Sequence, residues 1–156
     1  DSVQTKVLVH NPDIVTIQCL MNDLYNFNNV GTLITQYIDA VLAHTNPNGK
    51  HPLIIVATDN AASDSIAPAY IYQYQVYTRD NLASAVAAYS ANPNVMFVDN
   101  WTAHVALGYQ SPAFLALLNA DGVHPNELGQ AWMWGNWKYT FWRMIERWFA
   151  YRFSVN

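Results

Sequence analysis

Apolar and polar positions along the chain predict strands and helices in alternation. Short continuous apolar runs, of the kind typical of strands buried on both faces, follow turn residues such as Asn-Pro. Apolar residues at helical spacing follow each run. This order predicts an α/β fold, a three-layer α/β/α sandwich with a parallel sheet. The predicted strands lie at 14–20 and within 51–60 and 92–100, and the helices at 30–44, 78–91, 111–120 and about 126–153.

Two segments fit this order less well. Residues 3–10 are predicted to be the end of a helix, and the tyrosine-rich segment 61–77 is predicted to be irregular. The next helix is then expected to start near Thr78 or Asp80, either of which can cap an N-terminus. Asp99, at the end of a strand, is interpreted as another cap or loop anchor.

In an open parallel sheet, ligands bind beyond the carboxyl ends of the strands. Three polar segments follow the predicted strands, and a fourth precedes the long last helix. We expect them to share one edge of the sheet and to form the functional site there. They are Met21-Asn22-Asp23, Thr58-Asp59-Asn60, Asp99-Asn100 and the loop Asp121–His124.

Composition narrows the possible partners. The 156 residues suit a single domain, 12% of them are charged, and the formal net charge is -4 without a basic run. Nucleic acid is therefore not expected as a partner. The spacing of His10, His44, His51 and His104 predicts no metal site, and no cofactor is expected. The cellular location stays open, with a secreted or extracellular protein compatible.

The stretch "DGVHPNELGQ" carries the strongest chemical signal. Asp121 and His124 on one tight turn can face a single site, where an acid orients a histidine base for a serine nucleophile. Alone, Asp-x-x-His is a weak motif, and a turn histidine that caps the last helix is the alternative. Its position before the last helix of an α/β chain is more specific.

With these residues in place, the chain resembles the SGNH (GDSL-type) hydrolase family of esterases and lipases. "DGVHPNELGQ" is similar to the family's last block, "NPDIVTIQCLMNDL" to the strand entering its Gly-x-Asn-Asp block, and "NPNVMFVDN" to the strand before the last block. The resemblance implies that His124 is the general base, Asp121 its orienting acid and Asn22 an oxyanion donor. It also implies that Asp23 supports the loop.

The chain departs from the family pattern at two places. Leu20 replaces the glycine of Gly-x-Asn-Asp, and a leucine is expected to avoid positive φ, so this loop is expected to differ. The blocks that hold the serine nucleophile and an oxyanion glycine are not recognised. Ser2, although preceded by Asp, lacks a strand before it and is not expected to be the nucleophile. The chain is therefore expected to be the C-terminal two-thirds of the domain, lacking the first strands.

The last helix is unusually aromatic. Trp134, Trp137, Phe141, Ile145 and Trp148 form one stripe at helical spacing, which predicts a core face. Further aromatic residues lie outside this stripe, so we expect the helix to pack on a partner chain, a second copy or the missing part of the domain. These residues are Trp142, Phe149 and Phe153.

Three functional hypotheses follow. The first is a serine ester hydrolase acting on acyl esters, with acylated carbohydrates or lipids as substrates. The second is a non-catalytic binding or structural protein of the same fold, which the absent serine and Leu20 favour. The third is a different α/β protein whose Asp-x-x-His is a coincidence.

Overall fold

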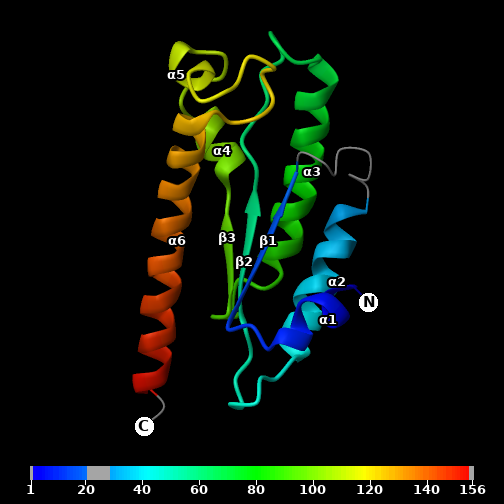
Figure 1. The fold of residues 1–156 in the computed structure, drawn as a ribbon, viewed down its shortest axis with the longest axis vertical. Helices are drawn as coiled ribbons and strands as arrows, with labels where there is room; N and C mark the ends of the chain where they lie inside the picture. The colour runs from blue at the N-terminus through cyan, green and yellow to red at the C-terminus, as the bar shows by residue number, and fades with distance from the viewer. Residues whose placement is uncertain (1, 21–28, 155–156) are drawn as a thin grey trace.

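Three parallel strands form the central layer of the computed structural model, which describes residues 2–20 and 29–154 (Figure 1). They are β1 (Ile14–Cys19), β2 (Leu53–Thr58) and β3 (Val95–Val98), in the order β1-β2-β3. Helices flank the sheet on both sides, so the predicted α/β/α sandwich is confirmed for this part of the chain.

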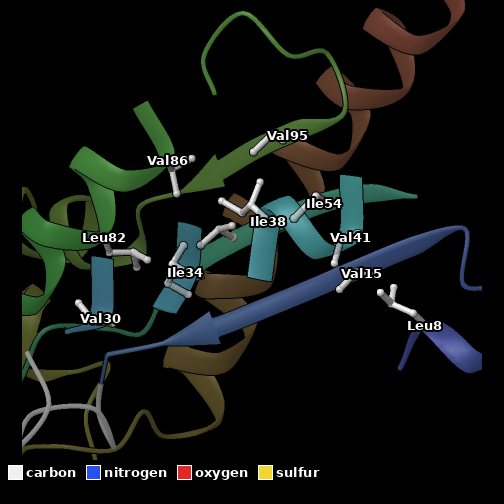
Figure 2. Close-up of a cluster of buried hydrophobic side chains, with 11 residues drawn as sticks. Leu8, Val15, Val30, Ile34, Ile38, Val41, Ile54, Leu82, Val86 and Val95 are labelled. Atoms are coloured by element: carbon white, nitrogen blue, oxygen red, sulfur yellow. The ribbon is translucent and has the colours of Figure 1, made fainter. Parts of the chain in front are cut away.

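One face of the sheet is covered by α2 (Val30–Ala43) and α3 (Ala69–Ala87), and Figure 2 shows the resulting core. Ile34 and Ile38 of α2 pack over Val15 and Ile54, whose side chains point to this face. The short α1 (Ser2–Lys6) and the 3-10 helix η1 (Leu8–His10) pack beside α2, where Leu8 enters the same core.

The opposite face is covered by α6 (Glu127–Ser154), which packs on β3 and buries Met144 against Ile55 and Val98. Because α6 lies on the β3 side, it leaves β1 open on this face: Ile14 is 38% exposed, and Thr16 and Gln18 are exposed. The prediction that residues 14–20 form a strand buried on both faces is therefore wrong, whereas the central β2 is buried on both.

The predicted irregular segment 61–77 is a second correction, because α3 begins at Ala69, directly after Pro68. Thr78 lies buried inside the helix and caps nothing, and Asp80 also lies within it. The buried face of α3 includes Gln75 and Thr78, two polar side chains. Because polar residues occupy part of the buried face, the sequence of the first half of α3 shows no apolar period of 3.6 residues, and the helix was not predicted there.

Two short helices and the start of α6 surround the carboxyl edge of the sheet. They are α4 (Asn100–Val105) and α5 (Pro112–Leu115). Asp99 caps α4 by accepting a hydrogen bond from the Thr102 N–H, as expected from the sequence.

The buried stripe of α6 differs from the predicted one. Met133, Thr140 and Met144 are buried, and Trp137 and Phe141 pack against the core beside them. Trp134, predicted to lie on the core face, is instead 66% exposed, because the true stripe is rotated toward the less hydrophobic Thr140. Among the described residues, none of the helices is both long enough and apolar enough to cross a bilayer.

Candidate functional site

The carboxyl ends of β2 and β3 meet the loop that precedes α6 (Figure 1). The Asn100 side chain donates to the Thr58 carbonyl at 2.8 Å, which joins the two strand ends. The Asn60 side chain donates to the Val123 carbonyl at 2.9 Å, which joins β2 to the Asp121–His124 loop. Three of the four predicted polar segments therefore share one edge, and Met21-Asn22-Asp23 lies outside the described residues.

The Asp121–His124 turn is shaped by its glycine. Gly122 has φ +67, a conformation that L side chains rarely adopt. A Cβ added there would lie 2.6 Å from Cβ of Ile66, on the segment that follows β2. Glycine is therefore required both by the backbone conformation and by the close approach of the two loops.

The far end of this loop is held by the start of α6. The Asn126 side chain accepts from the Gly129 N–H at 2.9 Å and donates to the carbonyls of Ala116 and Leu118. A Cβ on Gly129 would lie 2.2 Å from the Leu117 carbonyl oxygen. Asn126 and Gly129 of "HPNELGQ" thus fix α6 against the preceding loop.

Asp121 uses both carboxylate oxygens. Oδ1 accepts from the Val123 N–H at 2.9 Å and from the His124 N–H at 3.0 Å, and Oδ2 lies 2.8 Å from Nδ1 of His124. Hydrogen bonds from the Val123 N–H, the His124 ring and the His124 N–H lower the pKa of Asp121 to about 2. The acid is therefore ionised at neutral pH.

An ionised acid at this distance fixes the state of the His124 ring. The carboxylate only accepts, so Nδ1 carries a proton toward it, and in the neutral tautomer that this contact selects Nε2 is the acceptor. The His124 side chain is 64% exposed, and no described residue hydrogen-bonds its Nε2. This arrangement can accept a proton at Nε2 while Asp121 stabilises the imidazolium that forms.

A buried polar group lies behind this edge. His104 is fully buried: Nδ1 accepts from the Ala61 N–H at 3.2 Å, and Nε2 donates to the Phe114 carbonyl at 3.0 Å. Burial lowers its pKa, so the ring stays neutral. Gln75, also fully buried, accepts from the Ala62 N–H at 2.8 Å. His104 and Gln75 thus fix the loop after β2 through the N–H groups of Ala61 and Ala62.

Leu20 occupies the position of the glycine in the Gly-x-Asn-Asp pattern and has φ +155. Leu20 therefore adopts a positive φ, which is costly for a leucine. Its side chain is fully buried against Ala61, Phe114 and Leu118. Apolar burial of this side chain offsets the backbone strain.

The described residues contain no serine hydrogen-bonded to His124. Ser2 begins α1, which lies beside the C-terminal part of α2 rather than at the edge that holds His124 (Figure 1). Asn22 and Asp23, the residues expected to serve the oxyanion and the loop, lie outside the described residues.

Asn60 is the site residue whose role the sequence did not indicate. Its position after a strand placed it at the correct edge, but nothing in the sequence pairs it with Val123. Among the residues that the structure describes, no three His, Cys, Asp or Glu side chains are grouped so that they could hold a metal ion.

Comparison with known proteins identifies the family. The structure is similar to the crystal structure of the lipase/acylhydrolase from Enterococcus faecalis, with a TM-score of 0.60 and 20% sequence identity. The similarity covers 86% of this chain and 64% of that one, so the chain corresponds to less than two-thirds of that protein. No curated protein matches the sequence. The family model for GDSL-like lipase/acylhydrolase matches residues 1–135, and the chain therefore belongs to that family.

Proposed function

We propose that the protein hydrolyses acyl esters through a Ser-His-Asp triad in which this chain supplies His124 and Asp121. One observation carries the proposal: Nδ1 of His124 lies 2.8 Å from the Asp121 carboxylate while the ring stays exposed. Both residues fall within the segment that the family model matches.

In the proposed reaction, Nε2 of His124 takes the proton of a serine hydroxyl as the serine oxygen attacks the ester carbonyl. Asp121 stabilises the imidazolium, and the side-chain amide of Asn22 donates to the oxyanion. His124 then protonates the departing alcohol. A water molecule, deprotonated by the same ring, hydrolyses the acyl-enzyme and restores the serine. Asp23 supports the loop that carries Asn22.

We propose that the serine lies on a strand that pairs with the open edge of β1. Among the described strands, β1 pairs only with β2. A groove along its other side is lined by Val3, Val7, Ile14 and Tyr37. A parallel strand added there would end at the same edge of the sheet as His124.

The exposed aromatic side chains of α6 support a further part of this proposal, that the helix contacts a partner chain or the segment carrying the serine. Trp134 is 66% exposed, Tyr139 68% and Trp142 55%. Exposed apolar patches of this kind mark interaction surfaces. A pocket also lies between α6 and the starts of β1 and β2, and it is lined by Ile14, Leu53, Phe141, Ile145 and Phe149.

Acylated carbohydrates and lipids are the proposed substrate classes, with tyrosine and tryptophan side chains available to stack on sugar rings. A non-catalytic binding protein is the second candidate. Leu20 favours it, because it fills the position of a family glycine and takes a strained φ of +155.

The test is hydrolysis of p-nitrophenyl acetate together with labelling by a fluorophosphonate probe. The chain is assayed alone and joined to the serine-bearing segment of its natural protein. We expect turnover and labelling only in the joined form, and loss of turnover in His124→Ala. His10→Ala, which changes an exposed histidine of η1, serves as the matched control. Absence of turnover in the joined form would favour the non-catalytic function, and labelling of the chain alone would place the serine within it.

A further inference from the structure

Asn60 stands directly after β2, between the strand and the Asp121–His124 loop. It is 3% exposed. Its Nδ2 donates to two carbonyls, that of Val123 at 2.9 Å and that of Ala61 at 3.1 Å. Because both neighbours are acceptors, only the nitrogen of the amide can face them, so the orientation of the side chain is determined.

The other end of the Asn60 amide has no partner among the residues that the structure describes. Oδ1 is buried and accepts no hydrogen bond within the described part of the chain. A buried carbonyl oxygen without a donor opposes folding. A leucine of similar size would avoid this cost, so stability alone does not account for an asparagine. The hydrogen bond from Nδ2 of Asn60 to the Val123 carbonyl is the contact that an asparagine can make and a leucine cannot.

A second contact joins the same two loops. The Ser63 N–H donates to the Gly122 carbonyl at 2.7 Å, one residue before the carbonyl that Asn60 holds. The two consecutive carbonyls of the turn are thus bound from the loop after β2. That loop is itself held by Gln75 and by His104, through the N–H groups of Ala62 and Ala61. The loop that binds the Asp121–His124 turn is therefore itself buried and held by hydrogen bonds.

We infer that Asn60 is a positioning residue for the His124 base, which it holds through the Val123 carbonyl. This inference rests on the proposed function of His124. The Val123–His124 peptide carries the carbonyl that Asn60 binds and also the His124 N–H that donates to Asp121 at 3.0 Å. Fixing this peptide fixes the Asp121 carboxylate, and with it the plane of the His124 ring.

The test compares Asn60→Leu with a matched variant, Asn46→Leu. Asn46 is 4% exposed, and its Nδ2 donates to the Pro12 carbonyl at 3.0 Å. Its Oδ1 is also buried and has no partner within 2–20 and 29–154. It precedes β2, at the opposite end of the sheet from His124. Both substitutions remove the same kind of contact, but only one of them touches the turn.

The readout is the pKa of Asp121, followed by NMR of its carboxyl carbon in the chain as it stands. We expect about 2 in the wild type and in Asn46→Leu, and a clear rise toward 3.8 in Asn60→Leu as the Val123 and His124 N–H groups loosen. Exchange of these two amide protons should become about tenfold faster in Asn60→Leu alone. An unchanged pKa, or equal changes in both variants, would overturn the positioning role.

The wild type supplies a measurement that does not depend on a folded variant. The side-chain amide protons of Asn60 should exchange more than about tenfold slower than those of the exposed Asn48, and rapid exchange would contradict the inference. In the joined, active form, Asn60→Leu should lower kcat several-fold and leave KM nearly unchanged. Absence of turnover in the wild type would overturn the proposed function, and the Asp121 measurement would still decide the role of Asn60.

Discussion

Two histidines near the carboxyl edge of the sheet carry the same ring in opposite surroundings. His104 is fully buried, and both of its nitrogens are bonded to backbone groups. The His124 side chain is 64% exposed, and in the described part of the chain its ring is bonded through Nδ1 alone, to a carboxylate. The first ring joins Ala61 to Phe114 and stays neutral, whereas Nε2 of the second ring has no partner among the described residues and is available as an acceptor.

This difference lies in the partners and not in the ring. A backbone N–H on Nδ1 forces His104 to donate from Nε2, and burial disfavours its charged form. An ionised carboxylate on Nδ1 orients the His124 ring and leaves Nε2 of its neutral tautomer as an acceptor. Titratable side chains therefore divide into structural and chemical roles according to the charge and the exposure around them.

The largest expected effect comes from breaking the His124 side of this comparison. Asp121→Asn places an amide opposite Nδ1, so the ring can turn to the wrong tautomer and the imidazolium loses its counter-charge. In the joined, active protein we expect kcat to fall by roughly 10⁴-fold. Steady-state hydrolysis of p-nitrophenyl acetate measures it, with Asp80→Asn, an exposed residue of α3, as the control. A loss below about tenfold would argue against the proposed triad.

The second effect comes from breaking the buried side. His104→Ala removes a ring stacked on Phe114, at a centroid distance of 4.0 Å, and leaves the Ala61 N–H and the Phe114 carbonyl without partners. We expect the free energy of unfolding to fall by about 3 kcal/mol. Urea denaturation followed by tryptophan fluorescence measures this. His124→Ala, at an exposed position, should change stability by less than about 0.5 kcal/mol, and equal losses would contradict the comparison.

The smallest expected effect is the pH dependence of stability that His104 produces. The pKa of His104 is lowered in the folded state, so the unfolded chain binds the proton more readily. His104 thus contributes stability that is fully present above about pH 6.5, its unfolded pKa, and that is lost as the pH falls below it. The slope should reach at most about 1.4 kcal/mol per pH unit. Denaturation between pH 7 and 5 measures it, and His104→Ala should flatten the slope.

The order of most strands and helices was predictable from the sequence, because an apolar run or a clear apolar period identifies each of them. Two of the three corrections in the fold, those at α3 and α6, have one cause. The first half of α3 buries Gln75 and Thr78, and α6 buries Thr140 in place of Trp134. In both helices, polar residues on the buried face hide the helical period from an apolar pattern. Burial of these polar groups depends on tertiary contacts that local sequence does not encode.

Within the site, the short-range pair was predictable and the long-range contacts were not. Asp121 and His124 lie on one turn, so their spacing predicted that they face one site, and Nδ1 of His124 lies 2.8 Å from the Asp121 carboxylate. Asn60 and Val123 are far apart in sequence and meet only because β2 ends beside the loop before α6. The strained φ of Leu20 was also hidden, since it depends on the apolar surroundings of its side chain.

The open edge of β1 has a consequence for handling the protein. Unpaired N–H and C=O groups along a strand are a template for pairing with another chain, and here apolar side chains such as Ile14 lie beside them. Thr16 and Gln18 on this strand carry no charge that would repel a second copy. Without a strand on this edge, we expect the chain to self-associate as its concentration rises, which light scattering would measure. A lysine in place of Thr16 is the substitution best suited to keep it dispersed.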